Sequence, residues 1–314
     1  MSIGLPVHDG EPHLRAAIDS ILGQSFTDFE LVISDNASTD GSEAICRAYA
    51  TSDPRIRYFR SATNVGATRN FNQAFAHARA RYFKWAAHDD VIAPTFVERC
   101  VEVLDRDPGV VLCHSHTRII DERGARVGDY VYSAGYASGD LPSQRFRDML
   151  AEDRWCFELF GLIRAETMRA TDLLGAYVGS DRGFLAELAM RGRFAVLPEC
   201  LFSNRDHPGR AIRRFPAHHT RAVAENPTLA GRRVFPHWRI LAEYVRRVRR
   251  VPMPPAERAR CYLALGGWLR RHQNWARLGA DLVIAAVPGS GDLFLRLSGS
   301  ERHWLADRVR GHDR

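Results

Sequence analysis

Up to His114 the chain alternates short apolar runs with segments of helical spacing, and this alternation restricts it to few folds. Strands are predicted at residues 3–7, 29–33, 56–60, 81–86 and 110–114, and helices at 11–22, 42–50, 67–80 and 94–105. Strands separated by helices are joined by right-handed crossovers, which build a mainly parallel sheet with helices on both faces. The first half therefore predicts an α/β fold.

The second half is less regular. Residues 121–143 are rich in Gly, Tyr and Ser and predict loops or an irregular hairpin, followed by a helix at 141–150. Strands are expected at Phe157–Arg164 and Phe194–Leu197, on either side of a helix at 180–190 that Ser180 caps and Gly192 ends. Ser38 or Asp40 is expected to cap the helix at 42–50. Helical spacing at 238–248, 255–271 and 275–286, before a polar tail after Pro288, predicts a sheet domain at 1–215 and a helical region at 216–314.

Three predicted strands end in polar or acidic residues. They run into His8-Asp9, Ser34-Asp35-Asn36 and His88-Asp89-Asp90. Ligands of open α/β sheets bind beyond the carboxyl ends of the strands, so these residues predict a polar ligand site there. Asp35 could accept hydrogen bonds from a nucleotide base or a ribose. The alternative is a polar turn, which Asp, Asn and Ser also favour.

The adjacent carboxylates of Asp89 and Asp90 would repel each other unless water or a cation neutralises them. Mg²⁺ and Mn²⁺ prefer oxygen ligands and commonly bridge one or two carboxylates to substrate phosphates. The alternative is a helix amino terminus that carries acids, which the helix dipole also favours. The pair therefore predicts a site for Mn²⁺ or Mg²⁺.

Composition indicates the cellular compartment in which the protein is expected. The six cysteines are scattered without a CxxC pair, which favours reduced thiols over disulfides or a structural zinc site. No run approaches the roughly 18 apolar residues of a membrane-spanning helix, and no leader is expected before the strand that begins near Ser2. These features predict a cytoplasmic protein.

Charge is distributed unevenly along the chain. The formal net charge is +7, and the arginines that exceed the acidic residues lie in residues 205–314, while residues 1–204 are net acidic. Aromatic side chains such as Trp238, Trp268, Trp275 and Trp304 lie among these arginines. This part could bind an anionic membrane surface at the inner face of the membrane, bind a phosphate-bearing acceptor, or form a solvated basic face. Nucleic-acid binding is not predicted, because no recognised module accompanies the arginines.

Taken together, several segments in order resemble the family 2 glycosyltransferases. The matching segments are Ser2–Glu11, Phe29–Ser42, Asn64-Val65-Gly66, Trp85–Leu104, Gly179–Arg182 and Pro198–Gly209, within about residues 1–210. The resemblance implies a GT-A type, Rossmann-like sheet and an inverting transfer of a sugar from a nucleoside-diphosphate sugar. The acceptor would be a glycan, a lipid-linked sugar or a small molecule in polysaccharide or glycoconjugate biosynthesis.

The resemblance also implies roles for individual residues. Those that would border or bind the nucleotide are Pro6, Val7, Asp35 (at the base), Asn64 and Asp89. Those that would bind the metal are Asp90 and His207. Arg205 and Arg210 could bind the diphosphate through bidentate contacts or belong to the basic face. His88 stands where the family's acidic motif usually begins with Asp.

The general base implied by the resemblance is Asp181, at the start of the predicted helix at 180–190. An inverting transfer needs a base that takes the proton of the acceptor hydroxyl as the hydroxyl attacks. A first-turn Asp stays ionised, as a base must, although it could equally be a structural helix charge. Glu158, Glu187 and Asp153 are reserve candidates for the base.

Two other functions stay open. A sugar-phosphate nucleotidyltransferase uses a related sheet but needs a Gly-rich phosphate loop after the first strand, where this chain has Leu5-Pro6-Val7-His8-Asp9. A non-catalytic nucleotide-sugar-binding protein would keep the binding residues without the chemistry. The acceptor would be selected by the loops at 121–143 and after Pro208, for which fold-level analogy supplies no chemistry.

Overall fold

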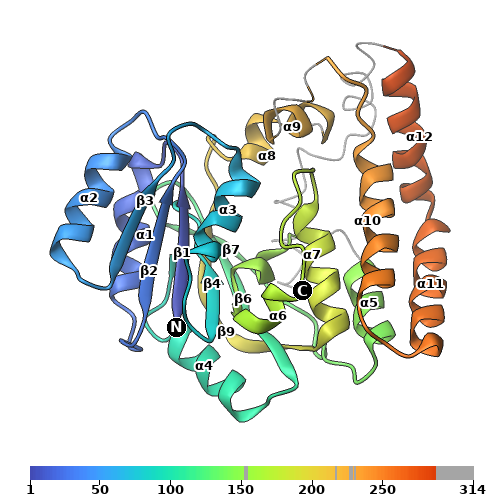
Figure 1. Ribbon diagram of the computed structural model, residues 1–314, viewed down its shortest axis with the longest axis horizontal. Helices are drawn as coiled ribbons and strands as arrows, with labels where there is room; N and C mark the ends of the chain where they lie inside the picture. The colour runs from blue at the N-terminus through green and yellow to red at the C-terminus, as the bar shows by residue number, and fades with distance from the viewer. Residues whose placement is uncertain (152–154, 216–217, 226–228, 230, 288–314) are drawn as a thin grey trace.

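The sheet of this protein lies between two layers of helices (Figure 1). The computed structural model describes residues 1–151, 155–215, 218–225, 229 and 231–287. The strands are β1 (Ser2–Val7), β2 (Glu30–Asp35), β3 (Ile56–Arg60), β4 (Tyr82–Trp85), β5 (Val91–Ile92), β6 (Val110–Ile120), β7 (Arg126–Tyr130), β8 (Leu162–Arg164) and β9 (Arg193–Arg205). The helices are α1 (Glu11–Leu22), α2 (Ser42–Ser52), α3 (Ala67–Ala76), α4 (Phe96–Arg106), α5 (Pro142–Ala151), η1 (Phe157–Phe160), α6 (Ala165–Arg169), α7 (Ser180–Arg191), α8 (Ala211–Arg214), α9 (His218–Glu225), α10 (Pro236–Arg250), α11 (Pro255–Leu269) and α12 (His272–Ala286).

The strand order brings the carboxyl ends of distant strands together. The order is β3-β2-β1-β4-β8-β6-β9-β5, with β7 beside β6. Strands β3, β2, β1 and β4 are parallel, β8 is antiparallel to both β4 and β6, and β9 is parallel to β6. It follows that β6 and β9 run in the same direction as β1, so all six of these strands end on the same side of the molecule. The α/β prediction is confirmed.

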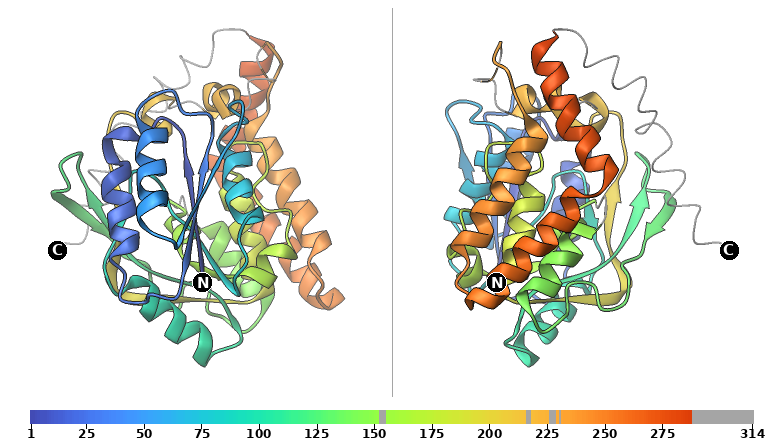
Figure 2. Two further views of the ribbon diagram at one scale, coloured as in Figure 1. Left: turned by 60° about the vertical axis from the view of Figure 1, so that its left-hand side comes forward. Right: turned by 90° about the vertical axis from the view of Figure 1, so that its right-hand side faces the viewer.

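Alternating side chains of the strands lie on opposite faces of the sheet and pack in two hydrophobic cores. Ile3, Leu5 and Val7 of β1 pack with α1, α2 and α4, while Phe83 and Trp85 of β4 pack with α3, α5 and α7 on the opposite face (Figure 2). This period of two is the geometry of a strand buried on both faces. Gly4 is required between these residues, because a Cβ there would lie 2.6 Å from the Phe83 ring.

Some local predictions were wrong. The segment Phe157–Arg164 is a short 3-10 turn (η1) followed by β8, because Gly161 packs so closely on β6 that a Cβ would lie 2.7 Å from the Cys113 carbonyl oxygen. Helix α7 is capped by Gly179, with φ of +81°, instead of Ser180, although it ends at Gly192 as predicted. Helix α3 ends at Ala76 instead of residue 80.

The cap of α2 also differs from the prediction. The N-cap residue is Gly41, and its position carries no side-chain cap hydrogen bond. The Asp40 carboxylate still accepts a hydrogen bond from the backbone N–H of Ser42, while the Ser38 hydroxyl binds the neighbouring loop after β1. Residues 121–143, predicted as loops or an irregular hairpin, contain the turn after β6 and one short strand, β7, which pairs antiparallel with β6.

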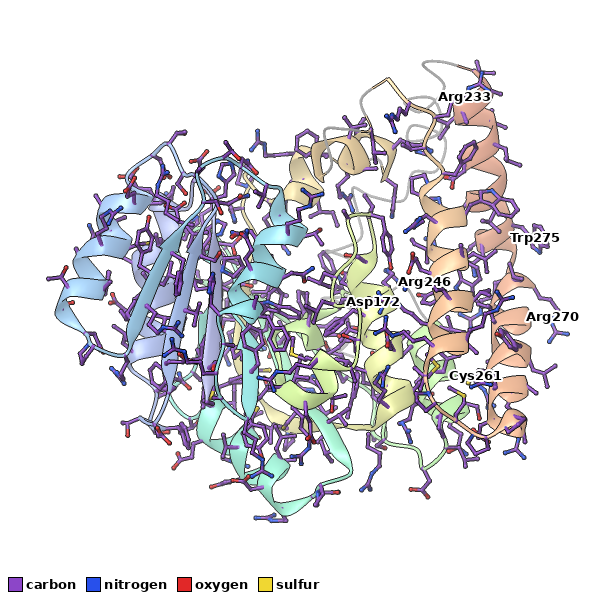
Figure 3. All side chains as sticks on the ribbon, in the orientation of Figure 1. Asp172, Arg233, Arg246, Cys261, Arg270 and Trp275 are labelled. Carbon is purple, nitrogen blue, oxygen red and sulfur yellow. The ribbon has the colours of Figure 1, made fainter. Side chains whose placement is uncertain are left out.

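The C-terminal helices share a core with the sheet domain. Ile240 and Tyr244 of α10 and Cys261 and Leu265 of α11 belong to the same buried cluster as α5 and α7. Fully buried Arg247 of α10 donates to Glu187 of α7 at 2.6 Å, and the exposed edge of α10 adds an ion pair between Arg246 and Asp172, which Figure 3 shows facing each other. The predicted boundary between residues 215 and 216 stays a prediction. The polar tail after Pro288 lies outside the described residues.

The six cysteines are free thiols, and five of them are buried. Within the part of the chain that the structure describes, no helix is both long enough and apolar enough to cross a bilayer.

The only lysine of the sequence, Lys84 in β4, is fully buried. Its ammonium donates to the carbonyl oxygens of Trp85 and Phe160 and lies 4.7 Å from the centre of the Phe96 ring. Burial lowers the pKa of Lys84 to about 7.

We expect Lys84→Met to lose stability relative to the wild type as the pH rises. Between the folded pKa, about 7, and the unfolded pKa near 10.4, the unfolded wild type binds the extra proton, so its stability increases with pH. The variant lacks this contribution, which is at most about 1.4 kcal/mol per pH unit. Urea unfolding of both proteins, near neutral pH and about two units higher, measures it. A free-energy difference between them that does not change with pH would contradict the account.

Candidate active site

Three loops at the carboxyl end of the parallel strands are joined by amide side chains. Asn36, after β2, donates to the Asn64 side-chain oxygen at 2.8 Å and accepts from the Val65 N–H at 2.7 Å. The Asn64 amide nitrogen lies 2.9 Å from Nε2 of His8, which follows β1. The predicted nucleotide residue Asn64 therefore fixes the loop before α3 against the ends of β1 and β2.

The loop after β1 is held in a strained conformation against the loop after β2. Asp9 and Ala37 have φ angles of 48° and 57°, in the left-handed region that non-glycine residues rarely adopt. The Asp9 carboxylate accepts from the Thr39 N–H at 2.7 Å, and the Asp9 N–H donates to the Ser38 hydroxyl at 3.1 Å. Strain held by such contacts is typical of binding sites.

Asp35 lies at the end of β2 and is fully buried. Its carboxylate accepts hydrogen bonds from the Tyr58 hydroxyl at 2.6 Å and the Ser38 N–H at 2.9 Å, and Arg60 lies 3.4 Å away. Tyr58 and Arg60 were missed in the sequence. They come from alternate positions of β3, and the register that pairs Asp35 with Arg60 was needed to find them.

Pro6 and Val7 border this site from within β1. Both side chains are buried, and they pair with Ser34 and Asp35 of β2. The Val7 carbonyl oxygen accepts from the Asn36 N–H at 2.9 Å and from the Asn70 amide at 3.2 Å. These two residues therefore shape the floor of the site and present no free side-chain polar group.

Asp89 and His207 face each other although 118 residues separate them in the chain. Nε2 of His207 lies 2.9 Å from Oδ2 of Asp89, and both side chains remain partly exposed. The pairing of β5 with β9 explains the contact, because Val91, two residues after Asp89, lies opposite Ser203 of β9. Burial acts to raise the pKa of Asp89, but the hydrogen bond to His207 and the nearby His88 and Arg210 lower it overall.

Asp90 points into the protein. Its carboxylate accepts from the Asn204 amide at 3.0 and 3.1 Å and from the Arg205 N–H at 2.8 Å, and it is 5% exposed. Burial and the neighbouring Asp89 raise the pKa of Asp90. Asp90 thus anchors the end of β9, which carries His207.

The predicted diphosphate contacts are held by other partners. Arg205 donates to the backbone carbonyl oxygens of Asp89, Asp121 and Glu122 and is buried. Arg210 lies 3.7 Å from Asp206 and stacks over the Trp155 ring at 5.7 Å. Arg205 therefore braces the loops, while Arg210 stays beside Asp89 and contributes to lowering the pKa of that carboxyl.

Two histidines complete the surroundings of Asp89 and His207. His13 of α1 packs edge-on against His207, with ring centres 4.9 Å apart. His88 packs on Gly10, where an added Cβ would lie 2.6 Å from the ring. The contact of His13 with His207 was not predicted, because the helical spacing of α1 does not indicate which distant residue His13 meets.

Asp181 lies in the first turn of α7 and is half-buried. Its Oδ1 accepts from the Arg182 N–H at 2.8 Å. Since α7 is joined to β9 by a tight turn at Gly192, it runs opposite to β9, and its amino terminus lies on the side where β1 and β2 end (Figure 1). The fold therefore brings Asp181 to the same side as Asp35 and Asp89.

The reserve candidates are placed differently. Glu158 is fully buried and accepts from the hydroxyls of Tyr132 and Tyr136 at 2.8 and 2.5 Å. Glu187 is fully buried between Arg247 and Arg191. Asp153 lies outside the described residues. Asp181 is the one described candidate that is not fully buried.

A resident metal would have few protein ligands here. Among the described residues, no group of three or more His, Cys, Asp or Glu side chains could hold a metal ion. Asp89 and His207 supply two suitable donor atoms on one side. This donor set fits a divalent ion that takes its remaining ligands from phosphate oxygens and water.

Polar side chains beyond the ends of β1, β2, β4 and β9, on a sheet of this order, define a GT-A type glycosyltransferase fold. The model of glycosyl transferase family 2 matches residues 2–165, and the chain belongs to this family. It is 32% identical to an uncharacterized glycosyltransferase of Rickettsia felis over 126 residues, an alignment that covers 40% of this chain and 21% of the relative. It is 30% identical to the putative glycosyltransferase EpsE of Bacillus subtilis over 146 residues, an alignment that covers 45% of this chain and 52% of EpsE. The chain thus spans about a fifth to a half of the length of these relatives.

Solved structures share the fold. The TarS 1–349 fragment of S. aureus in complex with UDP-GlcNAc has a TM-score of 0.63 and 16% identity, over 86% of this chain and 72% of that one. The mannosyltransferase PcManGT from Pyrobaculum calidifontis, in complex with GDP-Man and Mn²⁺, has a TM-score of 0.56 and 15% identity. The match covers 95% of this chain and 79% of that one. At these identities the likeness shows the fold alone.

Proposed function

We propose that this protein is an inverting glycosyltransferase that moves a sugar from a nucleoside-diphosphate sugar to an acceptor hydroxyl, assisted by a divalent cation. The observation that carries the proposal is the opposed pair Asp89 and His207, on the side of the sheet where Asp35 and Asp181 also lie. Membership in glycosyl transferase family 2 supports the reaction class.

Asp89 and His207 would hold Mn²⁺ or Mg²⁺. The bound cation would offset the negative charge on the departing diphosphate. The sequence predicted Asp90 as the direct ligand, but both of its oxygens accept hydrogen bonds from Asn204 and Arg205, so its role in the proposal is to anchor the strand that carries His207. The Mn²⁺ and GDP-Man in the PcManGT structure support a cation beside the diphosphate.

The nucleotide would lie across the ends of β1 and β2. Asp35, held by Tyr58 and Ser38, would face the base, and the Asn36, Asn64 and His8 contacts would shape the surrounding loops. UDP-GlcNAc in the TarS complex and GDP-Man in the PcManGT complex support a nucleotide-sugar donor. The panel of nucleoside diphosphates described below identifies the base.

Asp181 would act as the general base. Its carboxylate would take the proton of the acceptor hydroxyl as that oxygen attacks the anomeric carbon from the side opposite the diphosphate. Its partial exposure at the amino terminus of α7, on the side where β1 and β2 end, leaves it accessible to an acceptor. The buried partners of Glu158 and Glu187 argue against those residues as the base.

The alternatives have less support. The loop after β1 is His8-Asp9-Gly10, with one glycine, whereas a nucleotidyltransferase needs a Gly-rich phosphate loop there. A non-catalytic donor-binding protein would need no carboxylate at Asp181. It would bind the donor without turnover on any acceptor.

A thermal-shift panel of nucleoside diphosphates, with and without Mn²⁺, tests the proposal. We expect one base to raise the midpoint of unfolding when nucleotide and Mn²⁺ are both present, because a ligand at about 100 times its Kd stabilises the folded state by ~2.7 kcal/mol. Asp89→Asn should abolish the dependence on Mn²⁺, whereas the control Asp28→Asn, at an exposed residue before β2, should retain it. Stabilisation by no nucleotide, or equal stabilisation of Asp89→Asn, would contradict the proposal.

A further inference from the structure

Helix α12 exposes an apolar face. Trp275, Gly279, Leu282, Val283 and Ala286, here called the α12 outer face, recur at the spacing of one helix side and are all exposed. Trp275 is 57% exposed and Leu282 is 51% exposed. A helix on the surface of a globular protein normally turns such a face inward, so this arrangement requires an explanation.

Polar contacts fix the orientation of α12. Asp281, on the inner side, is fully buried and accepts from the backbone N–H groups of His237 and Trp238 at the start of α10. The Trp238 indole donates to the Leu278 carbonyl oxygen at 3.0 Å, and Asn274 donates to the Trp268 carbonyl oxygen at 2.8 Å. Rotating the apolar face inward would break all of these bonds. The packing of α12 on its neighbouring helices therefore keeps its apolar face exposed.

A basic hollow lies between α5 and α11 and extends to Arg270 and Arg271, which link α11 to α12. It has a volume of about 360 Å³, with an apolar floor that includes Leu150, Ala264 and Trp268. Its lining also includes the guanidinium groups of Arg147, Arg260, Arg270 and Arg271, and no acidic side chain among the described residues lines it. Arg147 and Arg270 are exposed. Figure 3 shows Arg270 and Trp275 projecting outward on the same side of the molecule.

We propose that α11 and α12 dock this protein on an anionic phospholipid membrane. The arginines of the hollow would bind lipid phosphates, and the α12 outer face, with Leu263 of α11 at 74% exposure, would enter the boundary between headgroups and acyl chains. Guanidinium groups bind phosphate in bidentate fashion, and tryptophan favours this boundary. The combination of positive charge and apolar surface fits a negatively charged bilayer better than a second copy of the chain, whose twofold interface would set like charges against each other.

The sugar-transfer proposal is independent of this inference. Helices α10, α11 and α12 lie together on the side of the molecule seen in the right view of Figure 2, and the hollow is formed by α5 and α11, none of which carries a candidate active-site residue. Membrane binding can thus be measured without donor, cation or acceptor.

Co-sedimentation of the full chain with lipid vesicles tests the proposal. We expect binding to vesicles of phosphatidylcholine mixed with phosphatidylglycerol, weaker binding at high salt, and no binding to phosphatidylcholine alone. The double variant Arg147→Gln/Arg270→Gln should partition about 30-fold more weakly, from ~1 kcal/mol for each arginine at the surface. Trp275→Ser/Leu282→Ser should lose at least about tenfold, because burial of both side chains is lost.

The control is Arg79→Gln/Arg106→Gln, which removes two exposed arginines from other parts of the surface and should bind like the wild type. All of the substituted side chains are exposed, so the thermal unfolding of the variants should match the wild type. The proposal would be overturned if the wild type failed to bind anionic vesicles. It would also be overturned if the α12 and hollow variants bound them as tightly as the wild type. Light scattering that shows a dimer separated by Leu282→Ser would also overturn it and assign the face to a second copy.

Discussion

Replacing Asp181 by asparagine is expected to slow sugar transfer by a factor of about 10² to 10⁴, the usual contribution of a general base. Asparagine has nearly the same shape and can keep the hydrogen bond from the Arg182 N–H. Donor affinity should therefore remain within about twofold, because Asp181 acts on the acceptor. The measurement is release of nucleoside diphosphate from the donor that the thermal-shift panel identifies, with a panel of sugar acceptors, together with calorimetric binding of the donor.

The control for this variant is Glu166→Gln. Glu166 is also an acid in the first turn of a helix, but it is exposed, and α6 follows β8 at the opposite end of the sheet. It should retain wild-type transfer. If Asp181→Asn keeps more than about a tenth of the wild-type rate, a loss smaller than general-base catalysis gives, the base is another residue. If the wild type transfers to no acceptor while binding the donor, the non-catalytic alternative is favoured.

Replacing Glu187 by glutamine is expected to lower the free energy of unfolding by about 3–5 kcal/mol, although this residue lies away from the ends of the strands. Glu187 and Arg247 are both fully buried and lie 2.6 Å apart, so the variant leaves the guanidinium in the core that joins α7 to α10 with only the more distant carboxylate of Glu243, at 4.0 Å. Urea unfolding followed by circular dichroism measures the loss.

Two comparisons show whether the charge is the cause. The double variant Glu187→Met/Arg247→Met removes both charges and should be less destabilised than Glu187→Gln, because apolar side chains of similar size can replace a buried pair at little cost. Arg99→Gln breaks the exposed pair with Glu199 and should cost less than ~1 kcal/mol. A loss for Glu187→Gln no larger than that for Arg99→Gln would contradict the account of this core.

The parallel half of the fold follows from local patterns in the sequence. Strands β1 and β3 and helix α1 lie where apolar spacing predicted them, within a residue or two, because their side chains must fill one or two buried faces. The positions of Asp35 and Asp89 at strand ends follow from the same pattern. Segments that depend on packing with distant strands were less predictable. The turn η1 replaces the first half of a predicted strand because Gly161 packs on β6.

The contacts within the site depend on the sheet order. His207 meets Asp89 because β5, which begins directly after Asp90, pairs with the end of β9, and no local pattern reveals this pairing. The strand register also brings Tyr58 to Asp35 and makes Asp90 an internal anchor for Asn204. A single sequence predicts which residues can do chemistry, whereas the pairing of distant strands decides which of them meet.

The C-terminal helices were predicted from their spacing, but their orientation was not. The apolar residues of α12 would ordinarily be assigned to a core. Asp281 reverses this assignment, because its hydrogen bonds to the start of α10 hold inward the side of α12 that carries Asn274, Leu278 and Asp281. The docking role proposed for these helices follows from that reversal.

The central claim, a divalent cation held between the ends of β4 and β9, is tested most directly by anomalous X-ray diffraction from a crystal of the protein with Mn²⁺ and the nucleoside diphosphate that stabilises it. The account predicts one manganese peak within about 2.3 Å of both a carboxylate oxygen of Asp89 and Nε2 of His207, with the diphosphate on its far side. A nucleotide bound away from Asp35, or a manganese ion that contacts neither residue, would contradict it.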